Sequence, residues 1–147
     1  MKQQLIALAL STALLAGSAA AIAPEEVFPA VNTYPGFADV AGSAWYAATV
    51  QTCYEVGLMT GTGANTFEPN LTTTRGMIVT ILYRLEGSPN IENEIWGYPF
   101  KDVDVNAYYA TAVYWARMNG IVAGYSDELF GPNDTITREQ MAAILYR

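Results

Sequence analysis

Two threonine–arginine pairs, Thr74-Arg75 and Thr137-Arg138, each open an apolar helical pattern. A helix start presents unpaired N–H donors and a partial positive charge, so an arginine beside it creates a small site for an anion. The planar guanidinium can also make two parallel hydrogen bonds to one carboxylate. We interpret both pairs as candidate anion-binding sites, although the same geometry suits a structural tie to Asp39, Asp102 or an acid of a neighbouring unit.

The two pairs belong to an internal repeat with an offset of 63 residues. The offset aligns residues 37–84 with 100–147 without a gap, and 19 of the 48 aligned positions are identical. Composition alone would give about three identities. The chain is therefore a tandem array of two similar units.

Each unit predicts two helices joined by a polar loop. Apolar residues at i, i+3 and i+4 follow Phe-x-Asp-Val and predict a first helix of about twelve residues, near Trp45 in one unit and Tyr108 in the other. Gly57 and Gly120 supply the left-handed residue that ends such a helix. The loop closes with Phe-x-Pro-Asn, and a second apolar-striped helix follows, with the threonine of each Thr-Arg pair as its N-cap.

The two predicted second helices differ in how their starts are capped. Residues 137–140 (Thr-Arg-Glu-Gln) form a capping box, in which the threonine and glutamine side chains each accept from a backbone N–H of the other residue. Gly76 and Met77 stand in the corresponding places of the first unit, so half of the box is missing there, a loss of about 1 kcal/mol. We therefore favour Arg138 over Arg75 as a binding residue.

The beginning of the chain predicts export. Met1-Lys2 is a short basic start, residues 5–16 are apolar and residues 17–21 are small, which is the pattern of a secretory signal peptide over residues 1–21. Residues 22–36 then form an N-terminal segment, and no membrane span is expected after cleavage. Cys53 is the single cysteine, so no intramolecular disulfide is expected.

The charge balance limits the partners. Without Lys2, six basic side chains stand against fourteen acidic ones, a net charge of −8. Such a surface repels polyanions, so nucleic acid is not an expected partner. An anionic ligand requires a short-range, organised cationic site. The chain has no histidine, the commonest metal ligand and general base.

One acidic segment resembles part of a calcium loop. Residues 102–106 (Asp-Val-Asp-Val-Asn) match its first three ligand positions. Ala107 and Val113 stand where that loop needs a glycine and a glutamate. We therefore expect no metal, no cofactor and no catalytic residue.

Taken in order, the motifs resemble a known family. Phe-x-Asp-Val, Trp/Tyr-Tyr with an Ala-rich helix, Gly-Ile/Leu-x-x-Gly, Phe-x-Pro-Asn, Ile-Thr-Arg-Glu-Gln-Met-Ala and Ile-Leu-Tyr-Arg are similar to the S-layer homology (SLH) repeat of bacterial surface proteins, over residues 37–147. The resemblance implies an all-α fold of tandem helix-loop-helix repeats in a pseudo-threefold bundle, here lacking a complete third repeat. It also implies a secreted protein of the bacterial cell surface that binds secondary cell-wall polysaccharide, often pyruvylated, or peptidoglycan-linked glycan, without covalent chemistry.

The resemblance also implies domain bounds and binding residues. Repeat 1 covers residues 37–87, a connector 88–99, and repeat 2, truncated at its C-terminus, 100–147. In the family the ligand lies in grooves between repeats and the arginine of the Thr-Arg motif takes part in recognition. Carried over by position, this implies ligand-binding roles for Arg138 and Arg75, and weaker ones for Thr137, Thr74 and Trp45.

Other interpretations stay open. The missing third repeat means either that the polypeptide is a fragment of a longer surface protein or that another chain supplies the third unit, as in a homo-oligomer. A self-assembling structural protein is an alternative function. A second alternative is a small wall-acting glycan hydrolase that uses a carboxylate pair, such as Glu25-Glu26 or Glu92-x-Glu94, although such pairs are typical of solvated surface.

Overall fold

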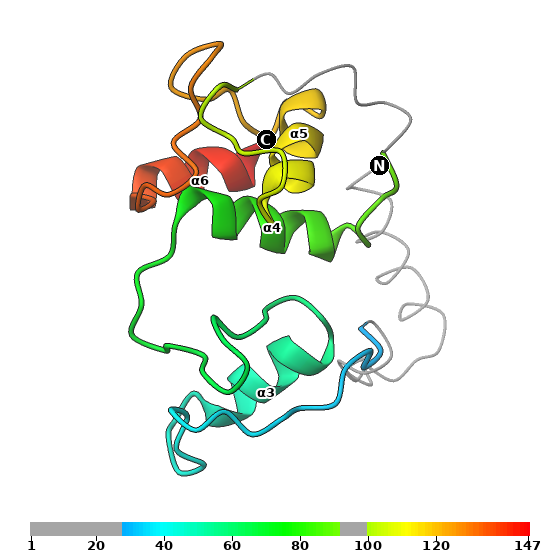
Figure 1. Ribbon diagram of the computed structural model, residues 1–147, viewed down its shortest axis with the longest axis vertical. Coiled ribbons are helices and arrows are strands. Elements are labelled where there is room, and N and C mark those ends of the chain that lie inside the picture. The colour runs from blue at the N-terminus through cyan, green and yellow to red at the C-terminus, as the bar shows by residue number, and fades with distance from the viewer. Residues whose placement is uncertain (1–27, 92–99) are drawn as a thin grey trace, which may run out of the picture. The chain divides into compact units, whose positions relative to one another are not determined.

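The computed structural model describes residues 28–91 and 100–147, and within these ranges it contains four α-helices and no strand (Figure 1). The helices are α3 (Ala47–Glu55), α4 (Arg75–Leu85), α5 (Ala110–Met118) and α6 (Arg138–Tyr146). The expected all-α class is confirmed. The predicted signal peptide, residues 22–27 of the N-terminal segment and residues 92–99 of the connector lie outside the described residues. None of the four helices is long and apolar enough to cross a membrane.

The first helix of each repeat is shorter than the sequence predicted. Helices α3 and α5 have nine residues each and begin at Ala47 and Ala110, because the aromatic residues before them belong to a turn. Both end before a glycine with positive φ, 77° at Gly57 and 67° at Gly120. The predicted C-terminal glycines are thus confirmed, since this left-handed conformation is strained for residues with a Cβ.

The predicted N-caps of the second helices are also confirmed. The Thr74 hydroxyl accepts from Met77 N at 3.3 Å, and the Thr137 hydroxyl accepts from Gln140 N at 3.3 Å. The Gln140 side chain accepts in return from Thr137 N, also at 3.3 Å, which completes the capping box only at α6.

An aspartate near the start of each repeat holds the loop that follows the first helix. Asp39 accepts from Phe67 N at 2.9 Å and from Glu68 N at 2.7 Å. Asp102 makes the same two bonds, at 2.9 and 2.7 Å, to the backbone N–H groups of Phe130 and Gly131. This contact explains why Phe-x-Asp and Phe-x-Pro-Asn recur together. It also shows that the alternative pairing of these aspartates with Arg75 or Arg138 was wrong.

The main core lies mostly within repeat 2, and α4 of repeat 1 completes it. Helix α4 of repeat 1 packs against α5 of repeat 2, as Figure 1 shows, and this is the one closely packed helix pair in the described chain. The core residues around α5 include Val79 from α4 and Ile144 from α6. Their burial against α5 stabilises the packing of these helices. Repeat 1 keeps a smaller cluster of its own, which comprises Phe37, Val40 and Val50 with the flanking rings of Tyr34, Tyr46, Tyr54 and Phe67.

The contact between the Asp39 carboxylate and the loop should stabilise the fold in a pH-dependent way. The backbone N–H groups of Phe67 and Glu68 hold the pKa of Asp39 below its usual value of 3.8. The pKa of Asp39 is therefore lower in the folded state than in the unfolded state. The contact stabilises the fold fully at pH values above the unfolded-state pKa, and this stabilisation is lost as the pH falls through the folded-state pKa. In Asp39→Asn we expect faster hydrogen exchange of the Phe67 and Glu68 amides at neutral pH, measured by NMR.

The matched control is Asp104→Asn, because among the described residues the Asp104 carboxylate accepts only from Asn106, within its own turn. Exchange at residues 67 and 68 should not change in this variant. Equal protection of these amides in Asp39→Asn and in the unchanged protein would contradict the assigned role of Asp39.

Candidate functional site

The start of α4 is joined to the loop of repeat 2 by backbone hydrogen bonds. Arg75 N donates to Asp134 O and Gly76 N donates to Pro132 O, both at 2.9 Å. In the opposite direction, Ile136 N donates to Thr73 O at 3.2 Å. The first turn of a helix leaves N–H groups without intrahelical partners, and here the next repeat supplies the acceptors. We call this contact the inter-repeat junction.

Arg75 lies buried in the inter-repeat junction, with 6% of its surface exposed. Its Nε donates to Phe130 O at 2.9 Å, and its guanidinium carbon lies 4.5 Å from the ring centre of Tyr125 and 4.7 Å from that of Phe130. Cation–π contacts of this kind are strongest where water is excluded. Arg75 is therefore placed as a structural tie, with a carbonyl and two rings as partners instead of the carboxylates that the sequence suggested.

Gly76 lies at the closest approach of α4 to repeat 2. A Cβ at this position would lie 3.0 Å from Pro132 O and 3.0 Å from Cδ1 of Tyr109, closer than such contacts normally are. Only glycine lets the helix start approach the loop of repeat 2 this closely. The corresponding residue of α6, Glu139, is exposed. Of the two residues in which repeat 1 departs from Glu139 and Gln140, Met77 removes the second half of the capping box, and Gly76 makes room for repeat 2.

The other predicted binding residues lie apart from the junction. Arg138 and Thr137 are exposed at the start of α6, and within the described ranges the Arg138 guanidinium makes no ion pair. Trp45 is 91% exposed on repeat 1 and contacts Tyr46 edge to face, with ring centres 5.4 Å apart. The structure brings Thr74 and Arg75 together but does not bring the five predicted residues into one site.

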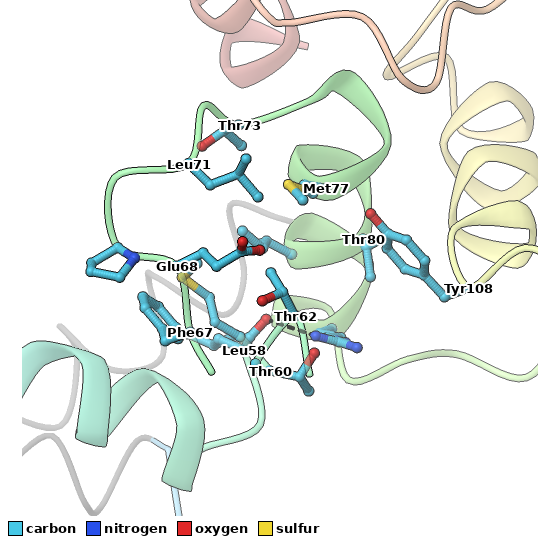
Figure 2. Close-up of a pocket in the computed structure, with 15 residues that line it drawn as sticks. Leu58, Thr60, Thr62, Phe67, Glu68, Leu71, Thr73, Met77, Thr80 and Tyr108 are labelled. Carbon is cyan, nitrogen blue, oxygen red and sulfur yellow. Dashed lines mark hydrogen bonds between the residues drawn. The ribbon is translucent and has the colours of Figure 1, made fainter. Parts of the chain in front are cut away.

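A hollow in the described chain lies between α4, the loops of repeat 1 and one side chain of repeat 2. We call it the inter-repeat groove; its volume is about 560 Å³. Figure 2 shows loop residues such as Leu58 and Glu68 beside Met77 and Thr80 of α4. The lining combines apolar side chains with four threonines and includes one carboxylate, that of Glu68. An apolar surface with spaced hydroxyl groups suits a small amphipathic ligand.

Tyr108 is the contribution of repeat 2 to the inter-repeat groove, and it lies beside Thr80 in Figure 2. Its side chain is 62% exposed and packs edge to face on Tyr109, with ring centres 5.0 Å apart. Partial burial raises the pKa of the Tyr108 hydroxyl, while a hydrogen bond with Thr74 and the charge of Arg84 act in the opposite direction. Tyr108 therefore lies close to both the helix start and the cation of the groove.

Arg84 is the cation of the inter-repeat groove, and the sequence reasoning did not nominate it. Its Nη1 donates to Leu58 O at 3.2 Å, and the side chain is half-buried. A signal was present, since Ile-Leu-Tyr-Arg is the longest identical run shared by the two repeats. Nothing local in the sequence shows that this part of the helix faces a hollow.

Comparison with known proteins identifies the repeats. The family described as "S-layer homology domain" matches residues 36–76 and 99–142. An endoglucanase from Bacillus sp. (strain KSM-635) is 39% identical over 116 residues, which are 79% of this chain and 12% of that protein. An amylopullulanase from Thermoanaerobacterium thermosulfurigenes is 32% identical over 119 residues, 78% of this chain and 6% of the relative.

A surface-layer 125 kDa protein from Lysinibacillus sphaericus is 31% identical over 106 residues, 70% of this chain and 8% of that protein. This chain thus spans 12% or less of the length of each of these three relatives. No solved structure matches it significantly.

The equivalent arginines allow a matched test of the inter-repeat junction. Arg75→Ala removes a buried hydrogen bond and two ring contacts, so we expect it to lower the free energy of unfolding by about 2–4 kcal/mol. Arg138→Ala alters an exposed side chain and should change it by no more than about 0.5 kcal/mol. Urea unfolding followed by circular dichroism measures both. Equal effects of the two substitutions would show that Arg75 is not a tie.

Proposed function

Because this chain belongs to the S-layer homology domain family of cell-surface modules, we propose that it anchors to the cell wall by binding cell-wall polysaccharide in the inter-repeat groove. The observation that carries the proposal is the groove itself, a hollow of about 560 Å³ assembled from both repeats. This volume lies within the usual range for small-molecule sites, so the groove accommodates a few sugar units. We also propose that the protein is secreted, because residues 1–21 have the pattern of a signal peptide.

The lining of the inter-repeat groove supports a sugar ligand. Sugars present apolar C–H faces and a rim of hydroxyl groups, and an aromatic ring suits such a face because it is apolar and rigid. The Tyr108 ring supplies that surface at the rim. The hydroxyls of Thr60, Thr62, Thr73 and Thr80 act both as donors and as acceptors toward sugar hydroxyls.

The same lining favours binding over hydrolysis. Glycoside hydrolysis generally requires two carboxyl groups on opposite sides of the scissile bond. Among the residues that line the inter-repeat groove, Glu68 is the single carboxylate. The carboxylate pairs of the hydrolase alternative, Glu25-Glu26 and Glu92-x-Glu94, lie outside the described residues. We therefore propose non-covalent attachment without catalysis.

Tyr108 tests where the glycan binds. In sedimentation with purified cell walls, Tyr108→Ala should weaken binding about fivefold to tenfold, which corresponds to about 1–1.4 kcal/mol. Trp45→Ala removes the equivalent aromatic residue of repeat 1, which does not line the inter-repeat groove, and is the matched comparison. If Trp45→Ala alone weakens binding, the glycan occupies the exposed edge of repeat 1 instead.

The start of α6 is a second proposed contact. Arg138 and Thr137 are exposed there, so a guanidinium and a helix start face solvent together. An acidic sugar substituent is one partner of suitable charge. Self-association is the other, because repeat 1 has a hollow lined by Tyr46, Glu68, Pro69, Asn70, Leu71 and Asp39, the counterparts of the surface of repeat 2 around Arg75 and Gly76. A helix start from a second copy fits that position.

Arg138→Ala separates these two roles. If Arg138 holds the glycan, the substitution should weaken sedimentation with cell walls at least tenfold, about 1.4 kcal/mol, with unchanged helicity in circular dichroism. If it docks into a second copy, sedimentation velocity should show an oligomer that the substitution converts to a monomer. Wall binding and an oligomeric state that are both unchanged in Arg138→Ala would exclude both roles.

A further inference from the structure

We propose that a second copy of this chain docks onto repeat 1 through the start and the apolar stripe of α6, and that Arg138 of one copy pairs with Glu68 of the other. The inference rests on the self-association proposed above for the start of α6 and is independent of glycan binding. It comes from comparing the two repeats at equivalent positions, which are 63 residues apart. The inter-repeat junction is made within the chain, and the two halves of a second such junction are largely exposed.

The first half is the apolar stripe of α6, which matches the stripe that α4 buries. Leu82 and Tyr83 of α4 pack against the main core. The equivalent residues of α6, Leu145 and Tyr146, are 64% and 92% exposed. An apolar helix face in a tandem array is covered by a neighbouring unit. Repeat 2 covers α4 in this way, and among the described residues no helix covers the stripe of α6.

The second half is a surface of repeat 1 that matches the one receiving the start of α4. In repeat 2 that surface is formed by residues 130–134, whose backbone carbonyls accept hydrogen bonds from the start of α4. Residues 68–71 border a hollow at the equivalent place in repeat 1. Phe130 lies under the Arg75 guanidinium and is fully buried, whereas its equivalent Phe67 is only half-buried. Repeat 1 therefore presents an open docking surface.

A difference between the repeats assigns the partner of a docked arginine. In repeat 2 the Tyr125 ring lies 4.5 Å from the Arg75 guanidinium carbon, and a Cβ at Gly131 would collide with that ring. The ring and a side chain at position 131 therefore exclude each other. Repeat 1 has Thr62 and Glu68 at these two positions, so the ring is absent and the glutamate side chain is directed into its place. An arginine docked here in the same way would meet a carboxylate instead of an aromatic face.

The backbone at Glu68 supports a role for this side chain. Its φ is 55°, in the left-handed region, and the equivalent Gly131 has a φ of 72°. This conformation is strained for a residue with a Cβ, and glycine would adopt it freely. Strained residues of this kind are concentrated at functional sites. Asp39 borders the same hollow, so the docking surface carries two carboxylates and is suited to a cation.

Arg138 carries the charge that this docking surface lacks. The side chain is exposed and makes no ion pair among the described residues. Copies of this acidic chain repel each other at long range, so their association requires a short-range pair of opposite charges. Glu139 stands in the place of Gly76, and its Cβ would keep two copies slightly farther apart than α4 and repeat 2 are. We therefore expect reversible association.

Reversing the two charges tests the pair. In sedimentation velocity the unchanged protein should associate in a concentration-dependent way. Glu68→Arg and Arg138→Glu should each weaken the association by more than about tenfold, because positions 68 and 138 then carry the same charge. In an equimolar mixture of the two variants, each of these positions meets the opposite charge on the other variant. The mixture should therefore associate about as tightly as the unchanged protein.

The apolar stripe is tested in the same measurement. Leu145→Ala should weaken the association about fivefold to tenfold, because it removes apolar area from the contact. Met118→Ala is the matched control and should cause no change. Met118 is 60% exposed at the end of α5 and belongs to neither half of the proposed contact.

Three results would overturn the proposal. The first is an unchanged protein that stays monomeric up to about 1 mM, a concentration at which even weak specific contacts form. The second is a mixture of the charge variants that stays monomeric although circular dichroism shows both to be folded. The third is association that neither charge reversal weakens. Cell walls are absent from all these measurements, so a negative result would leave the proposed glycan binding intact.

Discussion

The inter-repeat junction is the contact on which the rest of the described structure depends. Arg75 crosses from repeat 1 into repeat 2, where a carbonyl and two aromatic rings replace the water around its guanidinium. The neighbouring Gly76 allows the backbones to approach, and hydrogen bonds between the two segments satisfy the first turn of α4. With this contact in place, α4 can pack along α5, and Tyr108 is held beside the hollow that α4 borders.

The unit of packing therefore differs from the unit of repetition. Each repeat has its own aspartate-held loop, yet the closely packed helices of the described chain, α4 and α5, come from different repeats. A helix with one apolar face needs a partner, and in tandem arrays the neighbouring repeat supplies it. The position of Tyr108 at the inter-repeat groove consequently depends on the integrity of the junction between the repeats.

The two arginines of α4 have different surroundings at the two ends of one helix. Arg75, at the first turn, is enclosed by rings and contributes to stability. Arg84, at the last turn, borders the inter-repeat groove and keeps part of its hydrogen-bonding capacity unused within the described chain. Residue type does not distinguish the two positions, since a guanidinium suits both. They are distinguished by the neighbouring side chains and carbonyls, which come from residues far away along the chain.

The sequence by itself determined the features that depend on local interactions. The 63-residue repeat, the four helices, their threonine caps and the glycines that end the first helices were predicted, because capping and backbone conformation involve residues a few positions apart. The tertiary structure decided which helices pack together, why position 76 is glycine, and that Arg84 and Tyr108 share a groove while Arg75 is enclosed. Those outcomes rest on contacts between residues dozens of positions apart, such as Arg75 with Phe130, and no local pattern encodes such contacts.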